Sequence, residues 1–342
     1  MKLREIFNLT TRIIKIIIFS FLTIFFVLLI SELGLRFFFY IRNFFIPPNR
    51  LFSKYLGCEV KANDRWECEF PGFGLVKYST GPYGFRVFGD LKTRKKKILV
   101  LGDSHTQAWQ VSDGETYYDY LRKNNKNIEI FAYGCGGYGS LQEYMILDKY
   151  FDLIKPDLIL WQFCANDFIN NYHQLESESF RDNNRMVRPY LVNGKIRLLF
   201  PAYSKGLAYV ISRNSYLLNL VIVWLMKNNK KARWEEPLYN VTSPQFKKSV
   251  RVTSKIFSMV KKRVGDTPII AFGCSGIFPG VCKKYGIYYI QSDPFDYVNY
   301  MAKTKGLKID GMPYDGHFNK LGHLIIGKKI LEYLLKKSFV KT

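Results

Sequence analysis

The first pattern along the chain is a long apolar stretch near its amino terminus. Residues 16–31 are all uncharged, and apolar residues continue to residue 41. A helix rises about 1.5 Å per residue, so this stretch approaches the ~30 Å thickness of a bilayer core. Lys15 can extend to one interface, and Glu32 and Arg36, one helical turn apart, can pair at the other. No small-residue cleavage site follows, so the pattern predicts a transmembrane anchor at 16–40 rather than a removed signal peptide. A buried hydrophobic helix is the alternative.

The charges beside this stretch do not fix its orientation, because Lys and Arg are nearly balanced on its two sides. A short cytoplasmic arm at 1–15 and a large domain outside the cytoplasm are the simplest arrangement. Two pairs of cysteines could each close a small disulfide loop there, Cys58 with Cys68 and Cys274 with Cys282. Cys135 and Cys164 are interpreted as apolar packing residues or as a further disulfide.

After the anchor, residues 41–95 are rich in Pro and Gly, as in Pro71-Gly72-Phe73-Gly74 and Gly81-Pro82-Tyr83-Gly84-Phe85-Arg86. Turn residues at this density favour short strands and loops over long helices. The pattern predicts a neck that packs on the main domain.

From residue 96 to 340 apolar strand-like runs alternate with helical patterns. The predicted strands are Ile98–Leu101, Ile128–Tyr133, Leu158–Phe163, Pro268–Phe272 and Ile287–Gln291. The predicted helices are Thr116–Lys123, Ser140–Ile154, Pro244–Val264 and His323–Lys337. Such alternation is typical of an α/β fold in which helices cover both faces of a mostly parallel sheet. Sites in such folds form at the carboxyl ends of the strands.

An insertion at about 170–248 interrupts this alternation. Its first part, 170–193, is polar and predicted to be a loop, whereas 207–226 contains an apolar run. Polar residues such as Arg213 and Asn219 divide that run, so a second full membrane span is not expected. A cap helix resting on the membrane surface and an ordinary packing helix are both compatible with the pattern.

The composition adds a strong positive charge to this picture. The chain of 342 residues is 48% hydrophobic, enough for a sizeable core, and its formal net charge is +23. Such a charge indicates an anionic partner, which could be phospholipid, an acidic glycan or nucleic acid. The lysines are spread along the chain, and no zinc-finger spacing or basic zipper is present. A nucleic-acid partner is therefore not expected.

Chemistry-bearing residues follow the predicted strands. The first strand ends in Gly102-Asp103-Ser104-His105, the second in the glycine-rich run 133–140, and the third in Cys164-Ala165-Asn166-Asp167. Near the carboxyl terminus stands Asp315-Gly316-His317. A serine at a strand-to-helix turn can be a nucleophile or merely a helix cap. The glycines leave backbone N–H groups accessible to a ligand.

This set of motifs resembles the SGNH (GDSL-like) hydrolases over residues 96–335. Ser104 matches the block I serine, Gly137 the block II glycine, Asn166 the block III asparagine and His317 the block V histidine. The resemblance implies a three-layer α/β/α, flavodoxin-like fold. The membrane segment and a neck containing Gly84-Phe85-Arg86 look like those of membrane-anchored members of the family.

The resemblance implies acyl transfer through a serine ester. Ser104 would be the nucleophile, His317 its base and Asp315 the group that orients the base, although block V usually places two residues between this acid and histidine. The oxyanion hole would consist of the N–H groups of Ser104 and Gly137 and the side-chain amide of Asn166. Cys164 stands where the family usually has glycine.

The alternatives for these roles are few. The chain has four histidines, of which His105, His173 and His323 are the other three. Asp310 is a substitute for Asp315, and Asp103 is interpreted as a structural acid. Other glycines of the same run compete with Gly137, namely Gly134, Gly136 and Gly139.

The predicted function is therefore a serine esterase, acting on O-acetyl or other ester-linked acyl groups of a glycan or cell-envelope substrate. Its expected partners are that substrate and, through the anchor, the lipid bilayer. This chemistry requires no metal or organic cofactor. An O-acyltransferase would use the same residues, with a sugar hydroxyl in place of water. A non-catalytic envelope scaffold that retains the fold is the other alternative.

Overall fold

The computed structural model describes most of the chain, in two units. The described residues are 3–41, 50–70, 73–179, 182–183, 187–201, 215–218, 220–221, 240–273, 276–309 and 316–341. One unit contains Met1–Ile46 with Lys205–Arg233, and the other contains Pro47–Ser204 with Trp234–Thr342. Each unit is considered by itself.

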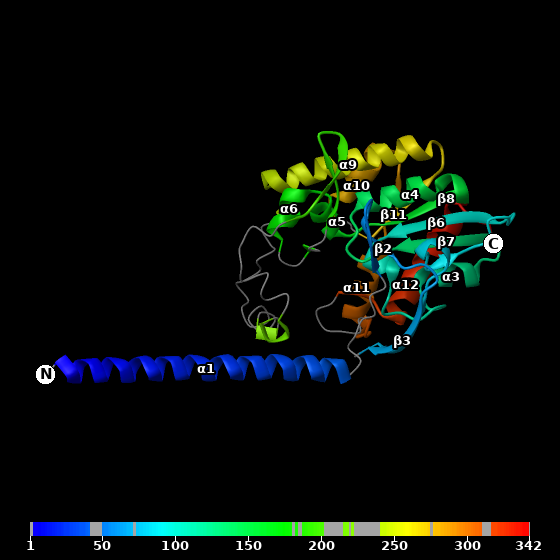
Figure 1. Ribbon diagram of the computed structural model, residues 1–342. Coiled ribbons are helices and arrows are strands. Elements are labelled where there is room, and N and C mark those ends of the chain that lie inside the picture. Colours follow the sequence, from blue (N-terminus) through cyan, green and yellow to red (C-terminus); the bar gives the residue numbers. More distant parts are fainter. Residues whose placement is uncertain are drawn as a thin grey trace. The chain divides into compact units, whose positions relative to one another are not determined.

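The smaller unit is dominated by the helix α1 (Leu3–Ile41), drawn in dark blue in Figure 1. Its segment Leu9–Phe38 has a mean hydropathy of 2.9 and is long and apolar enough to cross a membrane. The predicted pair is present, with Arg36 Nε 2.8 Å from Glu32 Oε1. Glu32 also accepts hydrogen bonds from the backbone N–H groups of Tyr216 and Leu217. Most of the predicted cap segment 207–226 lies outside the described residues.

The larger unit is built on a six-stranded sheet with the strand order β12-β11-β8-β6-β7-β5 (Figure 1). The strands are β5 (Val87–Phe88), β6 (Lys96–Gly102), β7 (Ile128–Gly134), β8 (Leu158–Gln162), β11 (Ile269–Phe272) and β12 (Tyr288–Tyr289). All neighbours pair in parallel except β5, which is antiparallel to β7. The predicted fold class, a mostly parallel α/β sheet, is confirmed.

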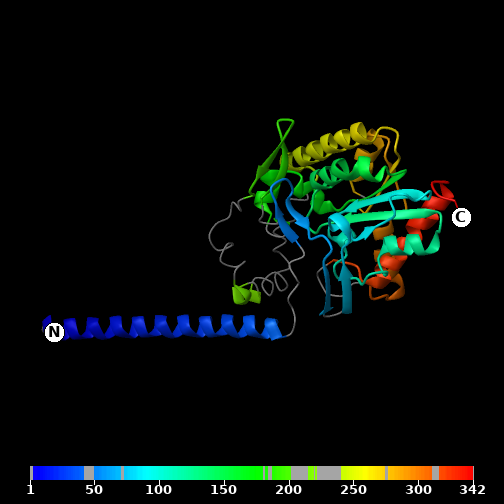
Figure 2. The ribbon, with the colours of Figure 1, turned by 45° about the vertical axis from the view of Figure 1, so that its right-hand side comes forward.

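Helices cover both faces of this sheet, because successive side chains of its strands point to opposite sides. In β6, Leu99 and Leu101 pack in one hydrophobic cluster and Ile98 and Val100 in the other. The first cluster includes residues of α4 (Ser140–Ile154), α9 (Pro244–Val264) and α10 (Phe278–Lys284). The second includes residues of α3 (Tyr117–Asn124), α11 (Pro294–Lys305) and α12 (Lys320–Lys336). Figure 2 shows these two helical layers on either side of the strands.

The segment predicted to be a neck contains two short antiparallel hairpins. They are formed by β1 (Arg50–Ser53) with β2 (Gly57–Val60) and by β3 (Arg65–Phe70) with β4 (Gly74–Ser79). A 3-10 turn, η1 (Pro82–Gly84), then leads into β5. Leu56, Val60 and Phe85 belong to the same core as the sheet, so the neck packs into the larger unit.

The disulfide that the spacing of Cys58 and Cys68 allowed is not formed. The β2 strand buries Cys58 against Cys135, with 3.8 Å between the two Sγ atoms, whereas Cys68 packs beside Val76 in a separate cluster. The five cysteines that the structure describes are thiols. Cys274, the other half of the second predicted pair, lies outside the described residues.

The prediction of a loop over 170–193 is also wrong. After α5 (Ala165–Asn170) the chain forms α6 (His173–Glu178), and later a hairpin of β9 (Arg188–Val192) and β10 (Lys195–Leu199). The polar residues that suggested a loop are partly internal. Glu176 and Arg188 form an ion pair in which both side chains are buried.

Candidate active site

Ser104 stands at a sharp turn between β6 and the one-turn helix α2 (Ser104–Gln107). Asp103 caps this helix, since its Oδ1 accepts a hydrogen bond of 3.1 Å from His105 N. The left-handed conformation of Ala108, with φ 46°, ends α2 after a single turn. The turn therefore holds the Ser104 side chain at the carboxyl edge of the sheet, where the parallel strands end.

His317 meets Ser104 at this edge, although the two residues are far apart in sequence. Its Nε2 lies 2.7 Å from Ser104 Oγ, a hydrogen-bond distance. His317 precedes α12, which Asn319 caps through hydrogen bonds to Leu321 N and Gly322 N. A bond of 2.6 Å from Asn319 N to Ile309 O also ties this segment to the chain before it. Asp315 and Asp310, the two candidates for the orienting acid, lie outside the described residues.

The other three histidines occupy different surroundings. His105 packs its ring against Phe295, at 4.8 Å, and against His317, at 4.9 Å between centroids. His323 is buried, and its Nδ1 accepts a hydrogen bond from Tyr117 N. Burial lowers the pKa of His323 to about 3, so this ring is neutral at physiological pH. His173 lies on α6, with its Nε2 3.1 Å from Phe200 O.

The glycine-rich loop after β7 packs directly against α2. Gly136 N donates a hydrogen bond of 2.7 Å to the side-chain Oε1 of Gln107. A Cβ at Gly134 would lie only 2.2 Å from Gln107 N, so a side chain there would separate the two loops. Gly137 follows with φ 77°, a conformation that favours glycine. The two loops are thus in direct contact at the carboxyl edge.

Asn166, on the first turn of α5, reaches the same edge. Its Nδ2 donates to Asp103 Oδ2 at 3.3 Å and to Asn170 Oδ1 at 3.2 Å. Asp103 itself donates its backbone N–H to Gln162 Oε1 at 3.1 Å. Asp103 is therefore a structural link between the serine turn and the asparagine, consistent with its interpretation as a structural acid.

Three carboxyl groups lie buried beneath the site, on Asp103, Glu143 and Asp167. Burial raises the pKa of each one, and their mutual repulsion adds to the rise for Glu143 and Asp167. Asp167 accepts hydrogen bonds from Ser140 Oγ and Cys164 N. Both oxygens of Glu143 are buried without a hydrogen-bond partner in the described part of the chain. Such burial favours the neutral, protonated form of this carboxyl.

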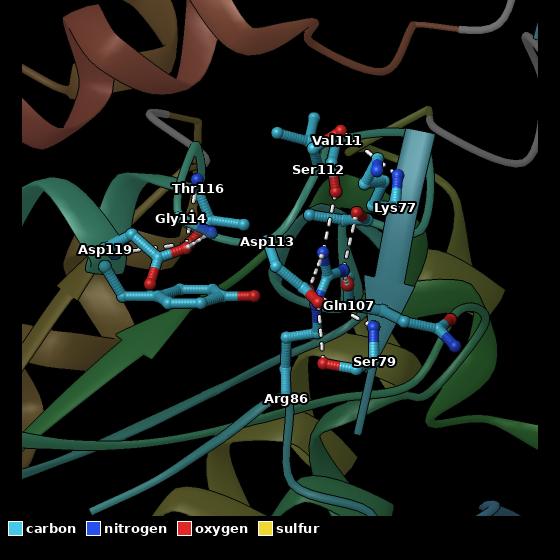
Figure 3. Close-up of polar contacts among 12 residues, drawn as sticks. Lys77, Ser79, Arg86, Gln107, Val111, Ser112, Asp113, Gly114, Thr116 and Asp119 are labelled. Carbon is cyan, nitrogen blue, oxygen red and sulfur yellow. Dashed lines mark hydrogen bonds and ion pairs between the residues drawn. The ribbon is translucent and has the colours of Figure 1, made fainter. Parts of the chain in front are cut away.

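The neck contributes a buried cation to the serine turn, shown in Figure 3. Arg86 donates from Nη1 to Gln107 O and Ala108 O, both at 2.9 Å, and from Nη2 to Val111 O at 2.6 Å. Its Nε donates to Asp113 Oδ1 at 3.0 Å, and Nη2 also pairs with that oxygen. All five guanidinium N–H groups are therefore used, three of them on the backbone that follows Ser104.

The insertion contributes a second buried cation, to the glycine-rich loop. Arg188 pairs through Nη1 with both oxygens of Glu176, at 2.8 and 2.9 Å. Its Nη2 donates to Gly137 O and to the side chain of Gln142. Tyr190 supports the pair by donating its hydroxyl to Glu176 Oε2. Each loop of the site is thus held by an arginine from a segment outside the alternating strands and helices.

Sequence reasoning missed the roles of these two arginines. The Gly84-Phe85-Arg86 motif carried a signal for Arg86, because it was one of the features behind the family resemblance. Arg188 had no such signal, since it lies in a polar stretch that predicted a loop. Gln107 and Gln162 link the loops from below, and no sequence pattern indicated this role for either residue.

Solved structures with a similar arrangement include several esterases. A member of the lipolytic G-D-S-L family from Veillonella parvula shares 11% identity at a TM-score of 0.37, over 69% of this chain and 97% of that chain. A family 3 carbohydrate esterase from Clostridium thermocellum shares 11% identity at a TM-score of 0.37, over 72% of this chain and 100% of that chain. A catalytic mutant of an acetylxylan esterase from Geobacillus stearothermophilus shares 13% identity at a TM-score of 0.35, over 69% of this chain and 93% of that chain. TM-scores this low carry no argument of their own.

The family assignment comes from the sequence match instead. A search of curated proteins found no match. The family model described as GDSL-like Lipase/Acylhydrolase matches residues 98–330, which is more than half of the chain and includes Ser104, Gly137, Asn166 and His317. The chain therefore belongs to the GDSL-like lipase/acylhydrolase family and is a hydrolase of ester bonds.

Proposed function

We propose that this protein is a membrane-anchored serine esterase that removes O-acetyl or other acyl groups from a glycan or cell-envelope substrate. The observation that carries the proposal is the hydrogen bond of 2.7 Å between Ser104 Oγ and His317 Nε2. A serine hydroxyl is a weak nucleophile at neutral pH unless a base within hydrogen-bond reach removes its proton. The net charge of +23 supports an acidic substrate.

In the proposed mechanism, His317 takes the Ser104 proton while Oγ attacks the ester carbonyl. The alcohol leaves with a proton from His317, and Ser104 then carries the acyl group. Water, deprotonated by the same imidazole, releases the acid and restores Ser104. Asp315 is proposed to orient the imidazole.

The tetrahedral intermediates carry a negative oxygen, which the N–H groups of Ser104 and Gly137 and the amide of Asn166 are proposed to stabilise. Both N–H groups of that amide are engaged here, on Asp103 and Asn170, at the long distances of 3.3 and 3.2 Å. One of these weak bonds would be exchanged for the oxyanion. Asp103 and Asn170 then keep the amide near the site before the substrate arrives.

The test is hydrolysis of para-nitrophenyl acetate by the full-length protein in detergent micelles. Ser104→Ala and His317→Ala are each expected to lower kcat/KM by roughly a thousandfold or more. The wild-type rate should fall as the pH drops below about 6.5, because a protonated imidazole cannot act as a base. Retained turnover in Ser104→Ala, or a flat rate down to about pH 5, would contradict the assignment of these residues.

The same assay separates hydrolysis from transfer. A sugar acceptor is added, and free acetate is measured beside the acetylated sugar. An esterase releases acetate at the same rate with and without the acceptor. If the acetyl group passes to the sugar at the expense of acetate release, the protein is an O-acyltransferase that uses the same residues.

We further propose that α1 anchors the chain with its larger unit outside the cytoplasm. Protease added to intact cells is then expected to degrade the larger unit while the amino-terminal arm remains protected. Degradation that occurs only after the membrane is permeabilised would place this unit in the cytoplasm.

A further inference from the structure

One recess in the larger unit is lined by residues that the proposed mechanism does not use. This groove has a volume of about 330 Å³ and is formed by the β9–β10 hairpin, the start of α6 and one face of α9. Its lining includes Asn171, Tyr172, His173, Tyr190, Leu191, Val192, Asn193, Gly194, Lys248, Arg251, Val252 and Lys255. None of these lining residues carries a carboxylate.

The basic side of the groove comes from a single helix. Lys248, Arg251 and Lys255 stand three and four residues apart on α9, so they share one helix face. All three are exposed, and none makes an ion pair within the described part of the chain. Arg263, near the end of the same helix, instead pairs with Asp148 and Asp152. Three of the six cations of α9 that make no ion pair in the described residues thus line the groove, whereas Lys247, Lys261 and Lys262 lie elsewhere on the helix.

The groove lies at the same edge of the sheet as Ser104. Helix α9 precedes β11, which is parallel to β8, so α9 runs from the carboxyl edge back to the amino edge. Lys248 and Arg251 are in the half of α9 nearer the carboxyl edge, and Lys255 lies just past its midpoint. Figures 1 and 2 show the β9–β10 hairpin beside this helix in both views.

Asn171 connects the groove to the site. It follows α5, whose first turn carries Asn166, and its Nδ2 donates to Thr253 Oγ1 on α9 at 3.0 Å. Its Oδ1 accepts from Leu141 N, at the start of the helix that follows the glycine-rich loop. Asn171 thus joins the lining of the groove to α9 and to the start of α4, the helix that follows the glycine-rich loop.

The remaining lining is suited to a sugar chain. Tyr172 and His173 are half-buried, and the His173 ring meets Tyr190 edge to face at 5.1 Å between centroids. The half-buried rings of Tyr172 and His173 and the exposed amide of Asn193 can provide apolar contact and hydrogen bonds to a polar ligand, whereas Tyr190 and Asn171 are buried and bonded within the protein. Together with three cations and no acid in the lining, these groups match a ligand that carries both sugar rings and negative charges.

We propose that this groove binds the chain of an acidic glycan, whose carboxylates pair with Lys248, Arg251 and Lys255 while an esterified unit lies at Ser104. This inference rests on the proposed esterase function and specifies its substrate class. A recess of about 330 Å³ favours a glycan chain over a flat membrane surface. The ion pairs formed here would be weakened by salt, because the cations are exposed.

Binding is tested without turnover, by calorimetric titration of the full-length protein in detergent micelles with oligogalacturonate that carries no acetyl groups. The triple variant Lys248→Gln/Arg251→Gln/Lys255→Gln is expected to bind about tenfold more weakly than the wild type, from three exposed ion pairs. Its matched control, Lys328→Gln/Lys336→Gln/Lys337→Gln, makes the same change in net charge on α12 and its C-cap residue, at the other face of the sheet. The control should bind as the wild type does.

A conservative variant guards against misfolding. Lys248→Arg/Lys255→Arg keeps the charge of the groove and is expected to keep the affinity. Equal loss in the groove and control triples would reduce the effect to overall net charge and overturn the proposal. Unchanged affinity of the groove triple for oligogalacturonate would also overturn the proposal. The same holds if the groove triple binds anionic lipid vesicles more weakly than the wild type but binds oligogalacturonate equally well.

Kinetics then connect the groove to the reaction. In the groove triple, the KM for acetylated oligogalacturonate relative to the KM for para-nitrophenyl acetate is expected to rise about tenfold, with the relative kcat preserved. The control triple should leave this ratio unchanged. If oligogalacturonate binds in the groove but Ser104→Ala does not affect release of acetate, the esterase function fails while the binding site stands. If Ser104→Ala is inactive and the ratio does not move, the groove proposal fails alone.

Discussion

The two loops of the site are each held by a buried arginine, but the two arginines work differently. Arg86 directs three of its hydrogen bonds to backbone carbonyls after Ser104, and its partner Asp113 has a side chain that is 41% exposed. Arg188 directs its strongest contacts to Glu176, whose side chain is 0% exposed, and reaches the glycine-rich loop through Gly137 O. Arg86 is mainly a clamp on backbone, whereas Arg188 is mainly half of a buried ion pair.

The difference predicts different costs on removal. A carboxylate left alone in the interior has no water to stabilise it, whereas a half-exposed one has. Replacing Arg188 should therefore mainly lower the free energy of unfolding. Loss of Arg86 should be felt relatively more in catalysis, because the carbonyls it holds belong to the backbone that positions the proposed nucleophile.

The largest expected effect is that of Arg188→Met. It leaves Glu176 buried without its cation, which costs about 3–5 kcal/mol in comparable pairs and should lower the Tm by roughly 10 °C. Thermal unfolding followed by circular dichroism measures it. Arg188→Met should also lower the kcat on para-nitrophenyl acetate. The double variant Arg188→Met/Glu176→Leu should recover most of the stability but not this kcat, because the hydrogen bond from Arg188 to Gly137 O is still absent. Recovery of both would show that Arg188 does not position the loop.

Arg86→Met is expected to lower stability less, by about 2–3 kcal/mol, because water can reach Asp113 while the buried carbonyls lose their donors. Its kcat on para-nitrophenyl acetate should fall by about tenfold or more, as the serine turn loses its clamp. Arg86→Lys should lie between wild type and Arg86→Met, since an ammonium group cannot reproduce the planar fork. An Arg86→Met enzyme with wild-type kcat would refute the clamp.

A smaller loss is expected where the two loops touch. Gln107→Met removes the acceptor for Gly136 N, and one unsatisfied buried N–H costs about 1 kcal/mol or somewhat more. Denaturant unfolding should show a lower midpoint with an unchanged slope. Gln107→Glu, which restores an acceptor at the same place, serves as its partner variant. Equal midpoints for Gln107→Met and the wild type would mean that the loops do not depend on this contact.

The smallest expected effect is a gain in stability, at the buried carboxyl of Glu143, which makes no ion pair in the described part of the chain. Burial raises the pKa of Glu143 above its usual 4.5, so the folded state favours the protonated carboxyl. The wild type therefore loses folding stability as the pH rises above 4.5, where the unfolded chain releases this proton. Glu143→Gln has no proton to lose and should be more stable than the wild type at pH 7. The advantage should shrink as the pH falls toward 4.5, because the unfolded wild-type carboxyl is then also protonated. Denaturant titrations at several pH values measure this, and an advantage independent of pH would contradict it.

Much of the fold could be predicted because its elements repeat a simple pattern. The five predicted strands and four predicted helices of the main domain are present, with ends shifted by a few residues. Runs such as Ile98–Leu101 are apolar at every position, which indicates a strand buried on both faces. The meeting of Ser104 with His317 follows from the family motifs together with the rule that sites form where parallel strands end.

The rest depends on contacts between distant residues that local patterns do not record. Glu176 and Arg188 look like surface residues in sequence, because their burial is possible only once they are paired. Cys58 is nearer in sequence to Cys68, but the hairpin of the neck turns it toward Cys135. The small local amphipathic signals of α6 and the β9–β10 hairpin are masked by these internal charges.

The sheet ends at both sides in strands of only two residues, β5 and β12. An exposed sheet edge is a template on which another chain can pair, and a short edge offers few backbone groups for this. For a protein whose anchor would confine it to a two-dimensional layer, where copies meet often, short edges limit strand pairing between neighbours. Both edges of the sheet thus offer few backbone groups on which a neighbouring copy could pair.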